Sequence, residues 1–197
     1  MRVLVLGAGG TGGYFGGRLA EGGGDVTFLV RPRRLEQLKR DGLVVRSPAG
    51  DIVRPVRALT REAIDGAYDY VLLSCKAYDL DDAIGAIGPA VGANTSIIPI
   101  LNGLNHIDTL AKSFGASKVL PGLVQISITM EPSGEIRHMA PFHGFIFGQI
   151  DGKISAQAQG FVDVFAQAKA KPQASTVIMQ EMWEKFYFLL QLKDRLL

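Results

Sequence analysis

Cysteine is almost absent from this sequence, since Cys75 is the single example among 197 residues. One cysteine forms no internal disulfide, and such scarcity favours a reducing compartment such as the cytoplasm. Long apolar runs are also missing, because no stretch reaches the roughly 18 residues that a membrane-spanning helix needs. The first apolar run, residues 2–6, stops at a glycine, unlike the core of a secretory signal peptide. We therefore expect a cytoplasmic protein with no membrane partner.

A strong charge of either sign is missing as well. The 21 Lys and Arg residues against 19 Asp and Glu residues give a formal net charge of +2, which argues against a nucleic-acid partner. The three histidines, His106, His138 and His143, lack a spacing to carboxylates or to Cys75 that would suggest a metal site. We expect neither a nucleic acid nor a metal. The length predicts one domain, or one domain and a fragment of another.

Glycine is unusually abundant, and many of its 24 copies fall within the first 24 positions. Residues 2–6 and 25–30 around them are short apolar runs without strict alternation, typical of strands buried on both faces of a parallel sheet. Residues 11–23 lie between these runs and have helical spacing. Further strands are expected over 43–47, 52–59, 68–76 and 96–103, and helices over 33–41, 79–87, 107–114, 155–170 and from about 180. This alternation predicts an α/β fold with a Rossmann-like, doubly wound, mostly parallel sheet.

Residues 118–149 break the alternation of strands and helices. Apolar and polar residues alternate there, and turn-forming residues occur at 131–134 (EPSG) and 140–144 (APFHG). Alternation with a period of two indicates strands that have one face exposed. We predict two or three antiparallel strands that extend the parallel sheet.

A glycine-rich loop follows the first strand and opens the first helix. Its pattern is Gly-x-Gly-x-x-Gly, in which the three glycines permit a tight turn, close approach of a pyrophosphate, and close packing of helix on strand. The unpaired amides at the start of the helix would face the phosphates. The alternative is a merely flexible turn, which the flanking strands disfavour. The predicted cofactor-binding residues of the loop are Gly7, Ala8, Gly9, Gly10, Thr11 and Gly12.

The residue after the second strand is Arg31, 19 positions beyond Gly12. A domain that binds NAD usually has a carboxylate here for the ribose hydroxyl, whereas an arginine suits the 2′-phosphate of NADP. Arg33 and Arg34 are close enough to help, because guanidinium groups pair with phosphate through two hydrogen bonds. The alternative is that these arginines only begin a solvated helix. We predict NADP as the cofactor.

Three further motifs complete the pattern: Lys76 in CKAYD after a buried strand, Asn102 in LNGLNHI after another, and Lys185 in MWEKF at the start of the last helix. With the glycine loop and Arg31, they resemble the ketopantoate reductase (2-dehydropantoate 2-reductase) family over nearly the whole chain. The residues alone also allow plainer interpretations. Lys76 could be a solvated loop lysine, Asn102 part of a common Asn-Gly turn, and Lys185 an exposed helix lysine paired with Glu181.

The resemblance implies an NADP-dependent oxidoreductase that reduces a 2-keto acid, typically 2-dehydropantoate, on the path to pantothenate. It implies that Lys76 meets the cofactor near its ribose and that Asn102 lies near the nicotinamide and the substrate. It makes Lys185 the catalytic lysine. The sequence departs from the family at Leu189 and Lys193. Typical members have polar residues, often asparagine, at these two positions, and those residues hold the substrate. These departures leave the identity of the keto acid open.

The resemblance also implies a second, mostly helical domain that closes over the substrate. We expect residues 1–172 to form the NADP-binding domain and residues 173–197 to begin the helical one, with the chain ending before the rest of it. The alternative to an active reductase is a truncated remnant that holds NADP without turnover. A flavin enzyme is a third candidate, disfavoured because its site also usually has an acid after the second strand.

The last helix is expected to be apolar around most of its circumference, more than one packing face requires. We predict a homodimer formed through this segment; the alternative is an exposed patch that is prone to association. Its apolar residues are Phe186, Tyr187, Phe188, Leu189, Leu190, Leu192, Leu196 and Leu197.

Overall fold

The structure is a computed structural model that describes residues 1–194, with the side chains of residues 1–191. The strands are Arg2–Leu6 (β1), Asp25–Leu29 (β2), Leu43–Arg46 (β3), Ile52–Arg54 (β4), Arg57–Leu59 (β5), Tyr70–Leu73 (β6), Ser96–Pro99 (β7), Gly122–Met130 (β8), Ile136–Gly148 (β9) and Gln173–Ser175 (β10). The α-helices are Gly10–Glu21 (α1), Pro32–Asp41 (α2), Leu80–Ile87 (α3), Asn105–Phe114 (α4), Ala156–Val164 (α5) and Ile178–Asp194 (α6). Short 3₁₀ turns occur at Arg61–Ala63 (η1), Ala77–Asp79 (η2), Gly88–Ala90 (η3) and Ala116–Lys118 (η4).

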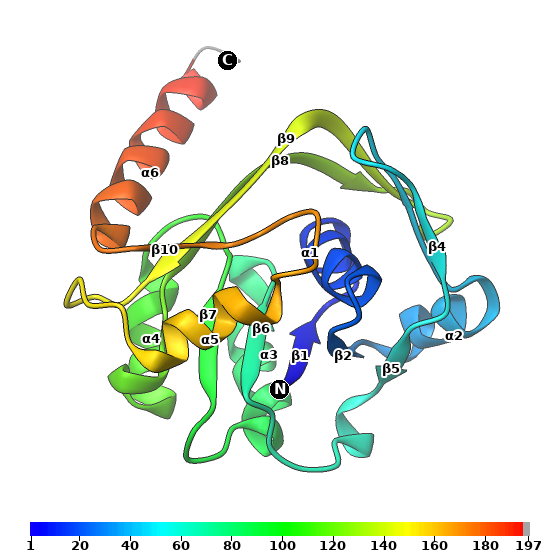
Figure 1. The fold of residues 1–197 in the computed structure, drawn as a ribbon, viewed down its shortest axis with the longest axis horizontal. Coiled ribbons are helices and arrows are strands. Elements are labelled where there is room, and N and C mark those ends of the chain that lie inside the picture. The colour runs from blue at the N-terminus through cyan, green and yellow to red at the C-terminus, as the bar shows by residue number, and fades with distance from the viewer. Residues whose placement is uncertain (195–197) are drawn as a thin grey trace.

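The first sheet is fully parallel, with the strand order β5-β2-β1-β6-β7. In its register Val5 lies between Phe28 on β2 and Leu72 on β6, and Leu72 pairs with Ile98 on β7. Helices connect these strands and lie against both faces of the sheet (Figure 1). The predicted Rossmann-like, doubly wound sheet is confirmed.

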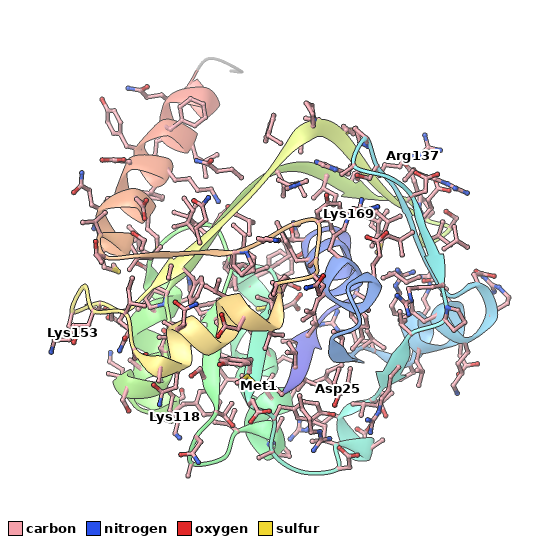
Figure 2. The ribbon with its side chains drawn as sticks, in the orientation of Figure 1. Met1, Asp25, Lys118, Arg137, Lys153 and Lys169 are labelled. Carbon is pink, nitrogen blue, oxygen red and sulfur yellow. The ribbon has the colours of Figure 1, made fainter. Side chains whose placement is uncertain are left out.

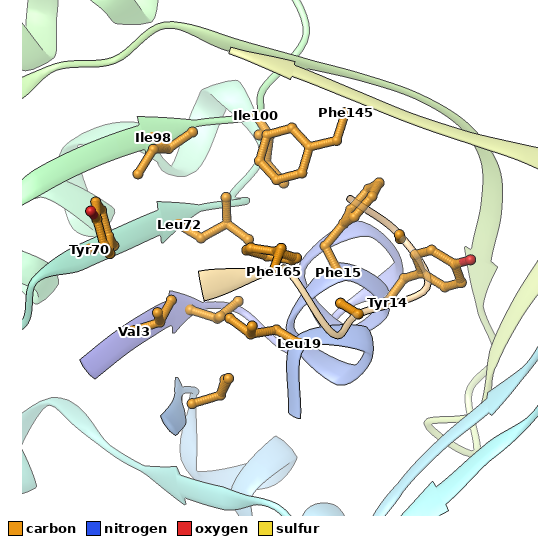
Figure 3. Packing of buried hydrophobic residues seen from close by; sticks show 14 of the residues in the cluster. Val3, Tyr14, Phe15, Leu19, Tyr70, Leu72, Ile98, Ile100, Phe145 and Phe165 are labelled. Atoms are coloured by element: carbon orange, nitrogen blue, oxygen red, sulfur yellow. The ribbon is translucent and has the colours of Figure 1, made fainter. Parts of the chain in front are cut away.

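Both faces of this sheet are buried, which explains the apolar runs without alternation. Val3 and Val5 of β1 point into one core, shared with Phe15 of α1 and Phe161 of α5. Leu4 between them points into the other core, with the inner sides of α3 and α4. Figure 3 shows the first core, in which aromatic rings from α1 and β9 meet the aliphatic side chains of the sheet.

The second sheet is mixed, with the order β10-β9-β3-β4 and β8 paired to β9. Its strands were expected to extend the parallel sheet, but they form a separate sheet that meets it at one isolated bridge, Ile97 with Val119. The predicted strand 52–59 also divides between the two sheets. Its first part, β4, pairs with β3, and its second part, β5, pairs with β2. The division falls at Pro55, which has no N–H to donate to either ladder.

The hairpin of β8 and β9 has only one of the two turns that we predicted. The turn at 131–134 is present, and the Gly134 N–H donates to the Glu131 carbonyl oxygen at 2.8 Å. At 140–144, however, β9 continues, and the pairing with β8 shifts in register near Ile126 and Ile128. Residues 139–142 of β9 have no partner on β8 at this shift, and such an irregularity bends a strand without ending it. The long hairpin arches over α1 (Figure 1).

The C-terminal helices differ from their predicted bounds. Helix α5 begins beside Ser155, whose hydroxyl accepts a hydrogen bond from the Ala158 N–H at 3.2 Å, and it ends at Val164 instead of residue 170. Phe165, Ala168 and Ala170 follow in turns that bury all three side chains in the first core. Helix α6 begins at Ile178 and extends from the body, with side chains on the side that faces the body and on the side that faces outward (Figure 2).

Candidate active site

The glycine loop joins β1 to α1 at the carboxyl edge of the parallel sheet. Gly7 has φ +92°, a left-handed conformation that favours glycine, and its N–H donates to the Leu29 carbonyl oxygen at 2.9 Å. A Cβ on Gly12 would overlap the Gly7 carbonyl oxygen and the Ser74 hydroxyl, whereas a Cβ on Gly9 would face open space. Gly12 therefore brings α1 against the sheet, and Gly9 leaves the backbone open to a ligand.

A cleft of about 1640 Å³ opens above this loop. It lies at the carboxyl edge of an open α/β sheet, where such sheets bind their ligands. Helix α6 and strand β8 form its other wall. All but one of the predicted site residues line it: Gly7, Ala8, Gly9, Gly10, Thr11, Arg31, Lys76, Asn102 and Lys185. The exception is Gly12, which packs beneath the loop.

Lys185 lies on the side of α6 that faces the body, between Met182 and Leu189. Its Nζ donates to Asn102 Oδ1 at 2.9 Å and to the Val124 carbonyl oxygen at 2.8 Å. Burial lowers the pKa of the Lys185 ammonium, because desolvation disfavours the charged form. The interpretation of Lys185 as an exposed lysine paired with Glu181 is wrong, since this pair is not among the ion pairs of the described residues.

Two arginines at the start of α2 reach the cleft in different ways, Arg31 just before the helix and Arg34 in its first turn. Arg31 is exposed, and its Nη2 lies 3.0 Å from Asp79 Oδ1 and 3.5 Å from Asp82 Oδ2. Arg34 donates from Nε to the Ala8 carbonyl oxygen at 3.0 Å, which ties α2 to the glycine loop. Its Nη2 is buried and has no hydrogen-bond partner among the described residues. Burial accordingly lowers the pKa of Arg34.

The sequence analysis missed three groups that contact the predicted site residues. Asp79 and Asp82 pair with Arg31, and the carbonyl oxygen of Val124 accepts from Lys185. The acids lie in η2 and in the first turn of α3, within the segment that follows the buried strand β6, so the rule that ligands bind at the carboxyl ends of strands could have identified them. The sequence carries no signal for Val124, because every residue has a carbonyl group.

Leu189 and Lys193, the two positions at which the sequence departs from the family that it resembles, lie on α6. Leu189 lines the cleft one turn beyond Lys185 and presents an apolar side chain there. Lys193 belongs to α6 by its backbone, but its side chain lies outside the described residues. Lys76, also in the cleft wall, is exposed.

Cys75 and His106 have surroundings that disfavour reactivity. Cys75 is half-buried, and burial raises the pKa of its thiol to about 11, so it stays protonated at neutral pH. His106 is buried, and desolvation lowers its pKa to about 4. In the described part of the chain no group of three His, Cys, Asp or Glu residues could hold a metal ion. None of the described helices combines the length and apolar character needed to cross a membrane.

The cleft fits the phosphate-bearing part of a dinucleotide. Gly9 leaves room for close approach of the backbone, and within residues 1–194 no side chain caps the N-terminus of α1. The first amides of a helix have no partner inside the helix, so they can donate to phosphate oxygens. The buried Nη2 of Arg34 adds a donor without a protein partner among these residues.

The chain resembles proteins of known family over most of its length. Residues 3–152 match the family described as ketopantoate reductase PanE/ApbA. The uncharacterized oxidoreductase YkpB of Bacillus subtilis is 40% identical over 190 residues, which cover 96% of this chain and 62% of YkpB. A 2-dehydropantoate 2-reductase of Mesorhizobium japonicum is 27% identical, covering 95% of this chain and 64% of that protein.

A solved structure has the same fold. The 2-dehydropantoate 2-reductase from Geobacter metallireducens superimposes with a TM-score of 0.86 at 29% sequence identity, covering 94% of this chain and 61% of that one. The chain thus spans less than two thirds of the length of these three relatives. The matched residues 3–152 contain the glycine loop, Arg31, Lys76 and Asn102, and they make up more than half of the sequence. The chain therefore belongs to the ketopantoate reductase PanE/ApbA family of oxidoreductases.

Proposed function

We propose that this chain carries the cofactor site and the catalytic lysine of an NADPH-dependent 2-keto acid reductase. The substrate we favour is 2-dehydropantoate, which is reduced to pantoate on the path to pantothenate. The observation that carries the proposal is the placement of Lys185, whose Nζ donates to Asn102 Oδ1 inside the cleft that contains the glycine loop. Family membership and the activity for which the Mesorhizobium and Geobacter relatives are named support the same reaction.

The proposed roles follow from the geometry of the cleft. The first amides of α1 and the Gly9 backbone hold the pyrophosphate, Arg31 binds the 2′-phosphate, and Lys76 lies along the cofactor. NADPH supplies the hydride when it is bound. Asn102 orients the Lys185 ammonium, which stabilises the negative charge that develops on the ketone oxygen and then donates a proton to it. The ketone carbon gains the hydride and the oxygen gains the proton, which yields the alcohol.

We propose a division of the chain at residue 172. Residues 1–172 then form the nucleotide-binding domain, to whose second sheet β10 (Gln173–Ser175) adds one strand, and α6 within residues 173–197 begins a helical domain that closes the cleft. Support comes from α6, which contributes Lys185 to the cleft while its outward side remains exposed. We further propose that a second copy of the chain covers that exposed side, giving a homodimer.

The activity test uses the 197-residue chain. NADPH is titrated into the protein, 2-dehydropantoate is added, and the loss of NADPH absorbance is followed. Lys185→Ala should lower kcat by about 10²- to 10⁴-fold, the usual contribution of a positioned proton donor. NADPH affinity should stay within a few-fold of the wild type. Lys153→Ala, at a lysine with 80% side-chain exposure, is the matched control.

The outcomes separate the two candidate functions. Oxidation by the wild type that is lost in Lys185→Ala supports the reductase. NADPH binding without oxidation in the wild type supports the remnant that holds NADP without turnover. Equal rates in Lys185→Ala and Lys153→Ala would remove the catalytic role of Lys185.

A further inference from the structure

Arg31 does not lie free at the cleft, because two carboxylates already hold its guanidinium. Its Nη2 lies 3.0 Å from Asp79 Oδ1 and 3.5 Å from Asp82 Oδ2, and all three residues line the cleft. The hydrogen bond to Asp79 raises the pKa of Arg31. Arg31, the residue expected to select the 2′-phosphate, is therefore already paired with two carboxylates before a nucleotide binds.

The sheet topology places this ion pair beside the glycine loop. Strand β1 lies between β2 and β6 in the sheet. Arg31 directly precedes α2 in the connection after β2, whereas Asp79 and Asp82 belong to η2 and α3 after β6. The bridge thus joins the two connections that flank the loop. In this fold the adenosine ribose lies between the first loop and the residue after the second strand.

The two cofactors differ in what they present at that position. NADPH carries a 2′-phosphate with roughly two negative charges, whereas NADH carries a neutral hydroxyl. A phosphate that approaches Arg31 meets the Asp79 and Asp82 carboxylates, and like charges placed together oppose binding. A ribose hydroxyl can instead donate a hydrogen bond to a carboxylate, as it does to the acid of NAD-binding domains. Here that acid would come from the connection after β6.

Asp79 is better placed than Asp82 for this role. Its side chain is 32% exposed against 70% for Asp82, and it makes the shorter contact to Arg31. A carboxylate that is partly shielded from water interacts more strongly with a nearby charge. Exposed ion pairs of this type are weak, so the bridge can open when a nucleotide enters.

We propose that Asp79, assisted by Asp82, reduces the preference of this cleft for NADPH over NADH and so allows NADH to bind as well. Asp79 accepts a hydrogen bond from the ribose hydroxyl of NADH, and both carboxylates oppose the 2′-phosphate of NADPH. The inference rests on the proposed function, because it concerns the same nucleotide site. It makes cofactor selectivity a balance between Arg31 and the two acids instead of a property of Arg31 alone.

The test measures the Kd of NADPH and of NADH by fluorescence titration for the wild type, Asp79→Asn, Asp82→Asn and the double variant. Each substitution keeps the size of the side chain and removes its charge. The ratio of Kd for NADH to Kd for NADPH should rise about tenfold in the double variant, with Asp79→Asn giving the larger part. Asp65→Asn is the matched control, because Asp65 also bridges two arginines, Arg2 and Arg57, but lies outside the cleft wall.

The ratio, and not either affinity alone, decides the result. Loss of two negative charges favours the phosphates of both nucleotides, but NADPH gains further at its 2′-phosphate, whereas NADH loses the carboxylate that accepts from its ribose hydroxyl. A ratio in the double variant that matches the wild type and Asp65→Asn overturns this inference, while NADPH oxidation by the wild type would leave the proposed function standing. A wild type that binds neither nucleotide overturns the proposed function, and this inference with it.

Discussion

The surroundings of Lys185 have opposite effects on the charge of its side chain. Burial disfavours its charge, which lowers the pKa, while Asn102 Oδ1 and the Val124 carbonyl oxygen accept hydrogen bonds from the charged form. The effect of desolvation is larger than that of the two hydrogen bonds, so the pKa is lowered. The ammonium therefore releases its proton more readily than an exposed lysine does. A proton donor works best when its pKa lies close to the working pH.

This balance predicts the pH dependence of the proposed reaction. Only protonated Lys185 can donate, so the rate should fall as the pH rises through the pKa of Lys185. Because that pKa is lowered, the fall should begin at a lower pH than the usual lysine value implies. Asn102→Ala removes an acceptor that favours the charged form, so it should move the alkaline limb of kcat to still lower pH. A pH profile of kcat for both proteins measures this, and an unmoved or raised limb in Asn102→Ala would contradict it.

The sequence identified individual residues better than it identified their partners. Arg31, Lys76 and Asn102 could be predicted to share one edge because each follows a strand, whereas only the family resemblance gave Lys185 a role; all four line the cleft. The partners are set by the packing of distant segments. Lys185 and Asn102 are 83 positions apart, and no local pattern links them.

The glycine loop is the element on which the proposed cofactor site depends, and its glycines have different tasks. Gly12 is limited by atoms of the protein, since a Cβ there would overlap the Gly7 carbonyl oxygen and the Ser74 hydroxyl. Gly9 faces open space and has φ −82°, a conformation that alanine adopts readily. Protein folding therefore requires glycine at position 12, whereas only a ligand would require it at position 9.

Two alanine substitutions separate these tasks. Gly12→Ala should destabilise the fold by about 1–3 kcal/mol through overpacking, which lowers Tm by roughly 2–12 °C in a chain of this size. Gly9→Ala should leave Tm unchanged and weaken NADPH about tenfold, because the added methyl group occupies the space that the pyrophosphate would approach. Thermal melts and NADPH titrations of both variants measure the two effects. A Gly9→Ala protein that binds NADPH like the wild type would contradict the proposed path of the cofactor.

Elements with a strong local pattern were predicted well, and those set by tertiary context were not. The apolar strand β1 and the Pro-initiated helix α2 lie where the sequence placed them. The division of residues 52–59 between two sheets depends on which neighbours β4 and β5 find, and apolar periodicity does not specify neighbours. Residues 140–144 contain turn-forming residues, but β9 runs through them, and only His143 and Gly144 among them pair with β8.

At the scale of the whole molecule, α6 combines a buried and an exposed side. Met182 packs in the second core and Lys185 reaches the cleft, while Trp183, Tyr187 and Leu190 are exposed at spacings of four and three residues. This spacing places the three side chains in one stripe along the outward side of the helix. Leu196 and Leu197, which the sequence analysis added to this surface, lie outside the described residues, as does the side chain of Leu192.

A dimer through this stripe would bring two copies of α6 together about a two-fold axis. In such an interface each substitution acts twice, so Tyr187→Glu with Leu190→Glu should place like charges opposite each other and raise the dimer Kd at least about 100-fold. Light scattering coupled to size exclusion should report a dimer for the wild type and a monomer for the double variant. Val53→Glu, at an exposed position on β4, is the control that should remain dimeric. A wild type that stays monomeric at high concentration, or a double variant that stays dimeric, would exclude α6 as the contact, because charged side chains are not tolerated in the apolar centre of an interface.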